Sequence, residues 1–245
     1  MIQKAIDILK LRKSDAILVI VIMVICHASR SMMTPLLSLL GPKALIVTGL
    51  ITMPISLLLI IVPIIFSLGF YRLTIFCSES PHKLCEYFSV GYKYFWKVFG
   101  FMLSLTLLCL VLAVSLAIVL STFLDLDFYI IVSEIAPYLI LLFAKYLYFI
   151  PAQIVVYNRS IFESVSKIKH FRGKEINFFI GLCLALRIIM LIISNVVCHF
   201  MTHYSVSHII ATICQIVVGT IVLFLLDLIA VLYVHRQFMA EQVLE

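Results

Sequence analysis

Six long apolar runs dominate this sequence, and each is long enough to cross a lipid bilayer as a helix. A transmembrane helix needs about 20 predominantly apolar residues to span the hydrocarbon core. Charged residues make up 12% of the chain, against about 25% in soluble domains. This pattern excludes a soluble globular protein and predicts an all-α integral membrane bundle. We place six transmembrane helices near 15–34, 44–70, 97–124, 128–155, 176–200 and 208–234.

The basic residues predict how these six helices are oriented. Most Lys and Arg residues fall in segments 1–15, 72–97 and 158–174 and in the tail after the sixth run. Positively charged loops stay in the cytoplasm, so these segments and both termini are predicted to be cytoplasmic. The net charge of +6 therefore lies at membrane edges, where the expected partners are membrane lipids and not nucleic acid.

A spacing of 81 residues relates three parts of the chain. Arg12, Lys93 and Lys174 follow one another at this spacing, and so do Gly100 and Gly181. Each part contains a short basic amphipathic segment followed by two apolar runs, which is typical of an internal repeat. We predict a single membrane domain over residues 1–245, in which three elbow-helix-plus-hairpin units lie near 1–80, 81–161 and 162–245.

The amphipathic segments predict elbow helices that lie along the cytoplasmic face of the membrane. Segment 84–93 has Leu84, Phe88 and Tyr92 on one face. Segment 161–172 has a longer stripe at helical spacing, formed by Ile161, Phe162, Val165, Ile168 and Phe171. Such helices either anchor each hairpin or bind lipids and protein partners directly. The candidates for contacts with lipid headgroups are Lys167, Lys169, Arg172 and Lys174.

Three ionisable residues lie deep inside predicted transmembrane helices. Lys145, Arg187 and Asp227 each fall near the middle of the membrane core, where an unpaired charge is unfavourable. Asp227 can neutralise one of the two cations, which leaves surplus positive charge. One hypothesis is a central polar site that binds an anionic headgroup or a small anion. The alternative is a structural ion pair between helices, with the other cation extending toward the membrane surface.

The sequence contains no recognisable catalytic motif. It lacks a Gly-rich phosphate-binding loop, a GxSxG nucleophile elbow and a pair of carboxylates in a water-facing loop. His199 and His203 are spaced to share a helical face, with His208 nearby, but no Glu accompanies them as in a metalloprotease site. We therefore expect no enzymatic activity, no cofactor and no metal centre.

Two stretches resemble a bacterial membrane-domain pattern. They are Lys145-Tyr-Leu-Tyr-Phe-Ile-Pro151, with a basic residue six before a proline, and the amphipathic Ser160-Ile-Phe-Glu-Ser-Val-Ser-Lys-Ile-Lys-His-Phe-Arg-Gly173. With the three elbow segments, they make the whole chain resemble the YciC-type inner-membrane proteins, which are related to the membrane domains of some glycerophosphodiester phosphodiesterases. The resemblance implies a six-helix fold in the bacterial cell inner membrane. It implies no activity, because the chain does not contain the catalytic phosphodiesterase domain.

Two classes of function follow from these observations. The first is a non-enzymatic multi-pass protein that binds or moves an anionic lipid or small solute through the Lys145, Arg187 and Asp227 centre. The second is a structural or interaction protein whose elbow helices scaffold partners or the inner leaflet. A water-accessible polar centre would favour the first class, whereas a dry and fully paired centre would favour the second.

Overall fold

The structure is a computed structural model whose backbone is described for residues 2–38, 41–76, 83–124, 143–168, 177–179, 181–182, 185, 189 and 208–242. Within these ranges, side chains are described except at 2–5, 32–38, 41–51, 124, 144–145, 208–211, 238 and 240–242. The described residues form helices joined by short links, and no β-strand occurs among them. For this part of the chain, the prediction of an all-α protein is confirmed.

Four helices have the length and hydropathy of membrane spans. They are α2 (Lys13–Ser38), α3 (Gly41–Phe76), α4 (Leu84–Leu124) and α9 (His208–Gln242). Their apolar segments are Lys13–Ser31, Thr52–Phe76, Leu84–Phe123 and Thr212–Gln237. These segments correspond to the first, second, third and sixth predicted runs. Several apolar helices of this length indicate a membrane protein.

The remaining helices named here are shorter. α1 (Ile2–Leu11) precedes α2, α6 (Ala144–Tyr157) is the described end of the fourth predicted run, and α7 (Ile161–Ile168) follows α6. The earlier part of the fourth run and nearly all of the fifth run lie outside the described residues. The count of six membrane helices therefore stays a prediction.

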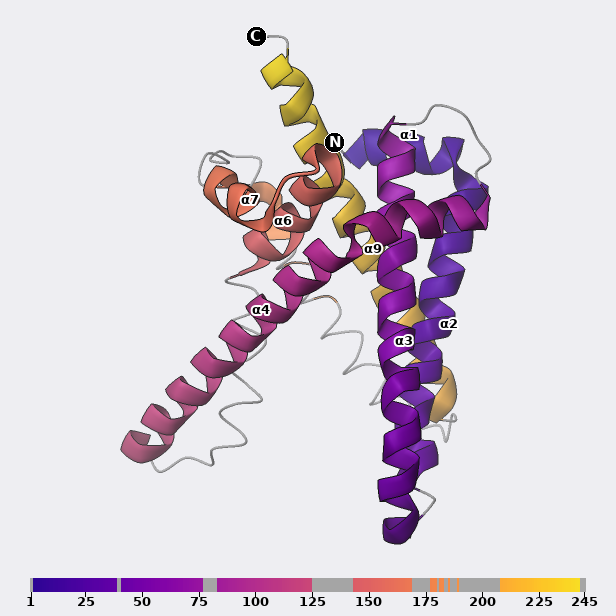
Figure 1. Cartoon of the computed structure of the whole chain (residues 1–245), viewed down its shortest axis with the longest axis vertical. Coiled ribbons are helices and arrows are strands. Elements are labelled where there is room, and N and C mark those ends of the chain that lie inside the picture. The colour runs from indigo at the N-terminus through magenta and orange to yellow at the C-terminus, as the bar shows by residue number, and fades with distance from the viewer. Residues whose placement is uncertain are drawn as a thin grey trace.

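The elbow segments gather at one end of the molecule. Figure 1 shows α2 and α3 side by side as a hairpin, and α9 packs against both. α3 continues as one helix through Pro54 and Pro63. α4 first crosses α3 and then runs obliquely away from it (Figure 1). This crossing part of α4 lies at the same end as α1, α7 and the last turns of α9 (Figure 1).

α3 and α4 cross in direct backbone contact at two glycines. A β-carbon on Gly69 would overlap the backbone oxygen of Tyr87, and a β-carbon on Gly91 would overlap the backbone oxygen of Ile65. Only glycine permits so close an approach of two helices. A β-carbon on Gly100, farther along α4, would meet no described atom within 4 Å. The two glycines therefore fix the amphipathic first part of α4 against α3.

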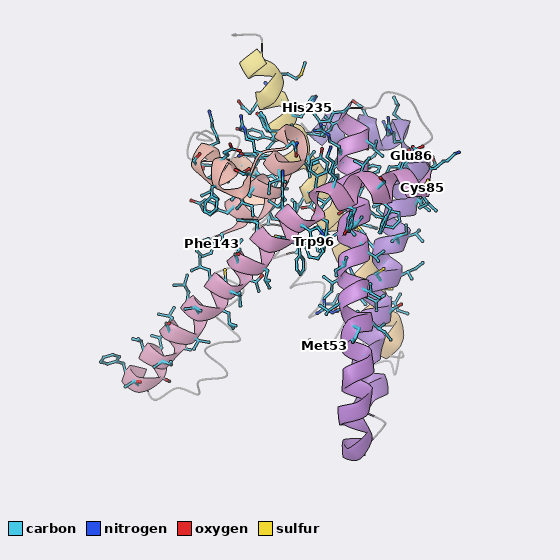
Figure 2. All side chains as sticks on the ribbon, in the orientation of Figure 1. Met53, Cys85, Glu86, Trp96, Phe143 and His235 are labelled. Carbon is cyan, nitrogen blue, oxygen red and sulfur yellow. The ribbon has the colours of Figure 1, made fainter. Side chains whose placement is uncertain are left out.

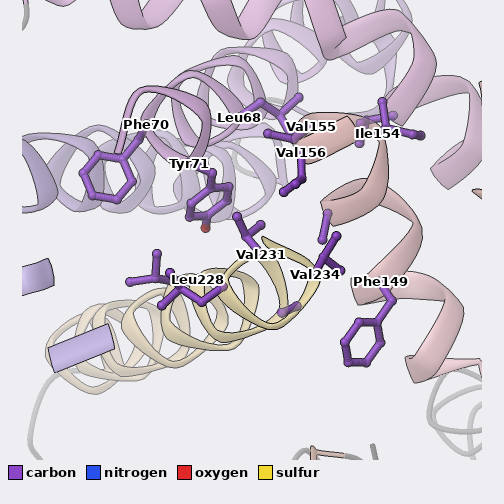
Figure 3. Packing of buried hydrophobic residues seen from close by; sticks show 14 of the residues in the cluster. Leu68, Phe70, Tyr71, Phe149, Ile154, Val155, Val156, Leu228, Val231 and Val234 are labelled. Carbon is purple, nitrogen blue, oxygen red and sulfur yellow. The ribbon is translucent and has the colours of Figure 1, made fainter. Parts of the chain in front are cut away.

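The main hydrophobic core lies where α3, α6 and α9 meet. Figure 3 shows Tyr71 of α3, Val155 of α6 and Val231 of α9 converging on a common centre, and all three residues are buried. The second half of α4 is different, because large apolar side chains project from it on several sides (Figure 2). An apolar surface of this extent is expected where lipid surrounds the helix.

Three residues of the predicted apolar stripe pack elbow helix α7 against the hydrophobic core. Ile168 is buried in the core, and Ile161 and Val165 pack against it. Phe162 does not share this environment, because it is 88% exposed. Ser164 occupies the buried position instead, and its hydroxyl donates a hydrogen bond to the Ser160 backbone oxygen at 2.9 Å. The apolar stripe therefore anchors α7 to the helices and leaves Phe162 free for other contacts.

A capping box starts α7. The backbone N–H of Ser160 donates to Glu163 Oε2 at 2.9 Å, and the backbone N–H of Glu163 donates to Ser160 Oγ at 3.4 Å. The hydrogen bond from the Ser160 backbone favours the charged carboxylate and holds the pKa of Glu163 below its ordinary value. The two residues thus define where the elbow helix begins.

The turn between α1 and α2 buries an ion pair. Arg12 Nη1 and Asp15 Oδ2 are 3.9 Å apart, and each residue is only 4% exposed. Removing one member of such a pair would leave an uncompensated charge. Arg12 therefore stabilises the entry of the chain into α2 and does not extend toward lipid headgroups.

Candidate functional site

A cavity of about 90 Å³ lies between α3, α4, α6 and α9. A cavity of this size has room for several waters or for a small polar group. Most of its lining residues are apolar. Its polar lining residues are Ser67 and Tyr71 of α3, Tyr148 of α6 and Asp227 of α9. An apolar cavity lined by a few polar groups is a candidate site for a small ligand.

Asp227 supplies the carboxyl group of the described cavity wall. The Tyr71 hydroxyl lies 3.4 Å from Asp227 Oδ2 and also 3.4 Å from the Phe224 backbone oxygen. Both distances exceed the usual value of about 2.7 Å for a hydroxyl donor, and one proton serves two acceptors. Among the described residues, no cationic side chain lies within salt-bridge distance of Asp227. The carboxylate therefore has a weak neutral partner and an adjoining space.

Arg72 holds the α6 wall of the cavity in place. Its Nη1 donates to the backbone oxygens of Val155 and Val156, both at 2.8 Å. Its guanidinium also lies 3.8 Å from the centre of the Phe76 ring. The two carbonyls belong to the last turn of α6, where a positive charge is favourable. Because Val155 lines the cavity, Arg72 ties α6 to α3 directly beside it.

A second polar contact lies on the same face of α9 as Asp227. A hydrogen bond of 3.1 Å joins His27 Nδ1 of α2 to Thr220 Oγ1 of α9. Thr220 lies about two turns before Asp227, so the two residues share a helical face. Through this face, α9 makes polar contacts with α2 at Thr220 and with α3 at Asp227.

The structure places one of the three predicted central charges in the cavity. Asp227 lines it. Lys145 belongs to α6, one turn before Tyr148, but its side chain lies outside the described residues, and so does all of Arg187. A centre shared by the three charges therefore stays a prediction.

The other predicted positions are mostly beyond the described part of the chain. Lys167 is exposed on α7, as a headgroup contact requires. In the ranges that the structure covers, no three potential metal-ligating side chains come together. The candidates that fall outside the described residues are Lys169, Arg172, Lys174, His199 and His203, together with the side chain of His208.

The sequence analysis missed Tyr71 and Arg72 as residues of the site. It ended the second run at residue 70 and took Arg72 as a cytoplasmic charge, whereas α3 continues to Phe76. A longer second run would have placed both residues inside the bundle. Their partners could not have been found in this way, because Tyr71 and Asp227 are 156 residues apart in the chain.

The cavity is suited to binding a small polar group. Its carboxylate accepts hydrogen bonds, its hydroxyls donate or accept them, and its apolar walls cover the remainder of a ligand. Comparisons with known proteins add no second source for this assignment, because no family model, no curated protein and no solved structure matches the chain.

Proposed function

We propose that this chain is a non-enzymatic multi-pass protein of the bacterial cell inner membrane that binds an anionic lipid or a small solute at a central polar site beside Asp227. In this proposal, six membrane helices surround the site and both termini are cytoplasmic. Lys145 and Arg187 supply the positive charge that an anion requires. The resemblance to the YciC-type proteins belongs to the same proposal.

The cavity beside Asp227 is the observation that carries the proposal. A carboxylate inside a membrane bundle is unfavourable unless it is paired or serves a function. Here its described partner is the Tyr71 hydroxyl at 3.4 Å. An unfilled space costs the groups that line it van der Waals contacts. A bound ligand would restore those contacts and give the carboxylate a partner.

Native mass spectrometry of the gently extracted protein, with analysis of the bound lipids, tests this function. The wild type is compared with Lys145→Ala and Arg187→Ala, and with Lys43→Ala as a cation removed from outside the centre. We expect a defined anionic lipid or solute on the wild type and on Lys43→Ala, and its loss from both central variants. Equal, nonspecific lipid profiles in folded samples of all four proteins would contradict the proposal.

The proposed orientation has a separate test. Its support is that α1 and the end of α9 lie at the same end of the molecule (Figure 1). A reporter enzyme fused after Glu245 should show cytoplasmic activity. Periplasmic activity would exclude an even number of membrane crossings with a cytoplasmic N-terminus.

A structural or interaction protein is the second candidate, and an exposed row on α4 favours it. Leu84, Phe88, Tyr92 and Trp96 are all exposed at four-residue spacing, which places them on one face. The Phe88 and Tyr92 rings stack with centroids 6.2 Å apart, and Trp96 Nε1 donates to the Tyr92 hydroxyl at 3.4 Å. A photo-crosslinking residue at position 88 separates the candidates. Lipid adducts favour a membrane anchor, whereas one discrete protein adduct favours a scaffold.

A further inference from the structure

An ionised carboxyl group in the described wall of the cavity would limit what the cavity can hold. Asp227 is the ionisable carboxyl group among its lining residues. Inside a protein, the low dielectric strengthens the repulsion between this carboxylate and any anion beside it. The same effect strengthens attraction to a cation. The cavity therefore suits the positively charged part of a ligand, whatever group binds elsewhere in the centre.

An organic ammonium group fits these walls better than a metal ion. Calcium takes six to eight oxygen ligands and magnesium takes six. The cavity offers the Asp227 carboxylate and the hydroxyls of Ser67, Tyr71 and Tyr148, and the other lining residues are apolar. A primary ammonium donates three hydrogen bonds, and its carbon stem can pack against apolar side chains. A quaternary ammonium has no N–H to donate to the carboxylate.

Tyr71 can give up its hydrogen bond to Asp227 when such a group binds. Its hydroxyl has two acceptors at equal distance, Asp227 Oδ2 and the Phe224 backbone oxygen, both at 3.4 Å. When Tyr71 donates to Phe224, its oxygen is available to accept a hydrogen bond. Asp227 and Tyr71 can then bind one ammonium group together, without leaving the Tyr71 proton unpaired.

We propose that the cavity beside Asp227 is a subsite for a primary ammonium group, carried either by an aminophospholipid headgroup or by a free small amine. The ammonium donates to the Asp227 carboxylate and to the Tyr71 oxygen, and its carbon stem lies along the apolar wall. The subsite rests on the proposed function, because the phosphate of the same headgroup, or an anionic group of the same solute, would bind the cations of the centre. A volume of about 90 Å³ accommodates the ammonium and its short stem, so the rest of a lipid would lie outside the cavity.

The test uses the full-length protein in nanodiscs that contain equal amounts of phosphatidylethanolamine, phosphatidylcholine and phosphatidylglycerol. Native mass spectrometry measures which lipids stay bound. Binding of free ethanolamine in detergent is measured in parallel by calorimetry. The variants are Asp227→Asn, which keeps the shape and removes the charge, and Tyr71→Phe. Thr220→Val is the matched control, because Thr220 lies on the same face of α9 but not among the lining residues.

The subsite predicts that the wild type retains phosphatidylethanolamine in preference to phosphatidylcholine. Asp227→Asn should reduce this preference at least about tenfold, because hydrogen bonds to a charged group are the strong ones. Tyr71→Phe should reduce it less, and Thr220→Val should leave it unchanged. Retention of the lipid without binding of ethanolamine identifies a lipid headgroup as the source, whereas binding of both identifies a small amine as sufficient.

Competition between ligands on the wild-type protein gives a test that does not depend on whether a variant folds. Tetramethylammonium has the charge but no N–H donor, so it should compete at least about tenfold less well than ethanolamine. Equal competition, or equal retention of the ethanolamine and choline lipids, would overturn the subsite. The proposed function survives that result if the wild type retains the anionic phosphatidylglycerol and Lys145→Ala loses it. If no lipid or solute is retained at all, both proposals fail.

Discussion

One turn of α3 has two faces that are packed in opposite ways. On one face, Gly69 lies against the α4 backbone at Tyr87 so closely that no β-carbon fits. On the other face, Ser67 and Tyr71 line a cavity of about 90 Å³ that also contacts Asp227. Gly69 stands between these two residues in the sequence. The contrast teaches that the loose face is not a general failure of packing, because the tight contact lies within two residues of it.

The two faces predict two kinds of mutational effect. Changes at the glycine crossing should alter stability, because neither backbone can move without displacing its whole helix. Changes in the cavity should alter ligand binding with little effect on stability, because the adjoining space can accommodate a changed side chain. Substitutions on each face, and away from both, test this division.

The largest effect is expected at the crossing. Gly91→Ala should lower the free energy of unfolding by about 3 kcal/mol or more, at the upper end of what overpacking causes, because its β-carbon would overlap the Ile65 oxygen. Gly69→Ala should behave alike. Thermal unfolding in detergent measures the loss. Gly100→Ala is the matched control on α4 and should be neutral or slightly stabilising. Equal behaviour of Gly91→Ala and Gly100→Ala would show that α3 and α4 do not cross as described.

Arg72→Ala should have the next largest effect. It removes both hydrogen bonds of 2.8 Å to Val155 and Val156 and leaves the carbonyls of two buried residues with less support. Hydrogen bonds to charged groups contribute about 1.5–3 kcal/mol, so a destabilisation of this size is expected in the same unfolding assay. Arg72→Lys should recover part of it, because the charge remains near the end of α6. Unchanged stability of Arg72→Ala would show that these hydrogen bonds do not hold α6 against α3.

A change on the loose face should affect stability less. Tyr71→Phe removes a hydroxyl whose two contacts are both 3.4 Å long, so the loss should be about 1 kcal/mol or less. Calorimetry with ethanolamine on the same samples should show weaker binding. A loss of stability as large as that of Arg72→Ala would mean that Tyr71 is a structural contact, and it would end the distinction between the two faces.

The smallest effect is expected at α7, away from both faces. The folded-state pKa of Glu163 lies below its ordinary value, so the capping box stabilises the helix start at neutral pH and loses this contribution as the pH falls through that lowered pKa. Glu163→Gln keeps an acceptor for the Ser160 N–H at every pH. Hydrogen exchange across 160–168 should show that the wild type loses protection, relative to this variant, as the pH falls from the ordinary Glu pKa of 4.5 through the lowered pKa. Parallel loss in both would exclude the carboxylate as the cause.

The sequence predicts the helices of this fold better than their contacts. Apolar run length identified α2, α3, α4 and α9, and the depth of Asp227 in the sixth run indicated a residue that points into the bundle. The crossing of Gly69 and Gly91 has no comparable signal, because neither glycine belongs to a GxxxG pattern. Contacts between helices depend on which faces meet, and no local pattern in the sequence encodes that choice.

The shape of the cavity could not be predicted from the sequence. Asp227 belongs to the predicted centre and lines the cavity, and its position inside an apolar run had already indicated an intramembrane carboxylate. Tyr71 and Arg72 reach the site through α3, and their roles depend on partners in α6 and α9. The cavity also depends on the path of α4 after its crossing, because α4 residues such as Val98 and Met102 line it.

A cryo-electron microscopy structure of the full chain in native-lipid nanodiscs, with a rigid antibody fragment as a fiducial, tests the Asp227 site most directly. We predict non-protein density in the cavity, within hydrogen-bonding distance of the Asp227 carboxylate and the Tyr71 hydroxyl. A cavity without such density, in which Asp227 forms a direct ion pair with Lys145 or Arg187, would contradict a binding site and identify the charges as a structural pair.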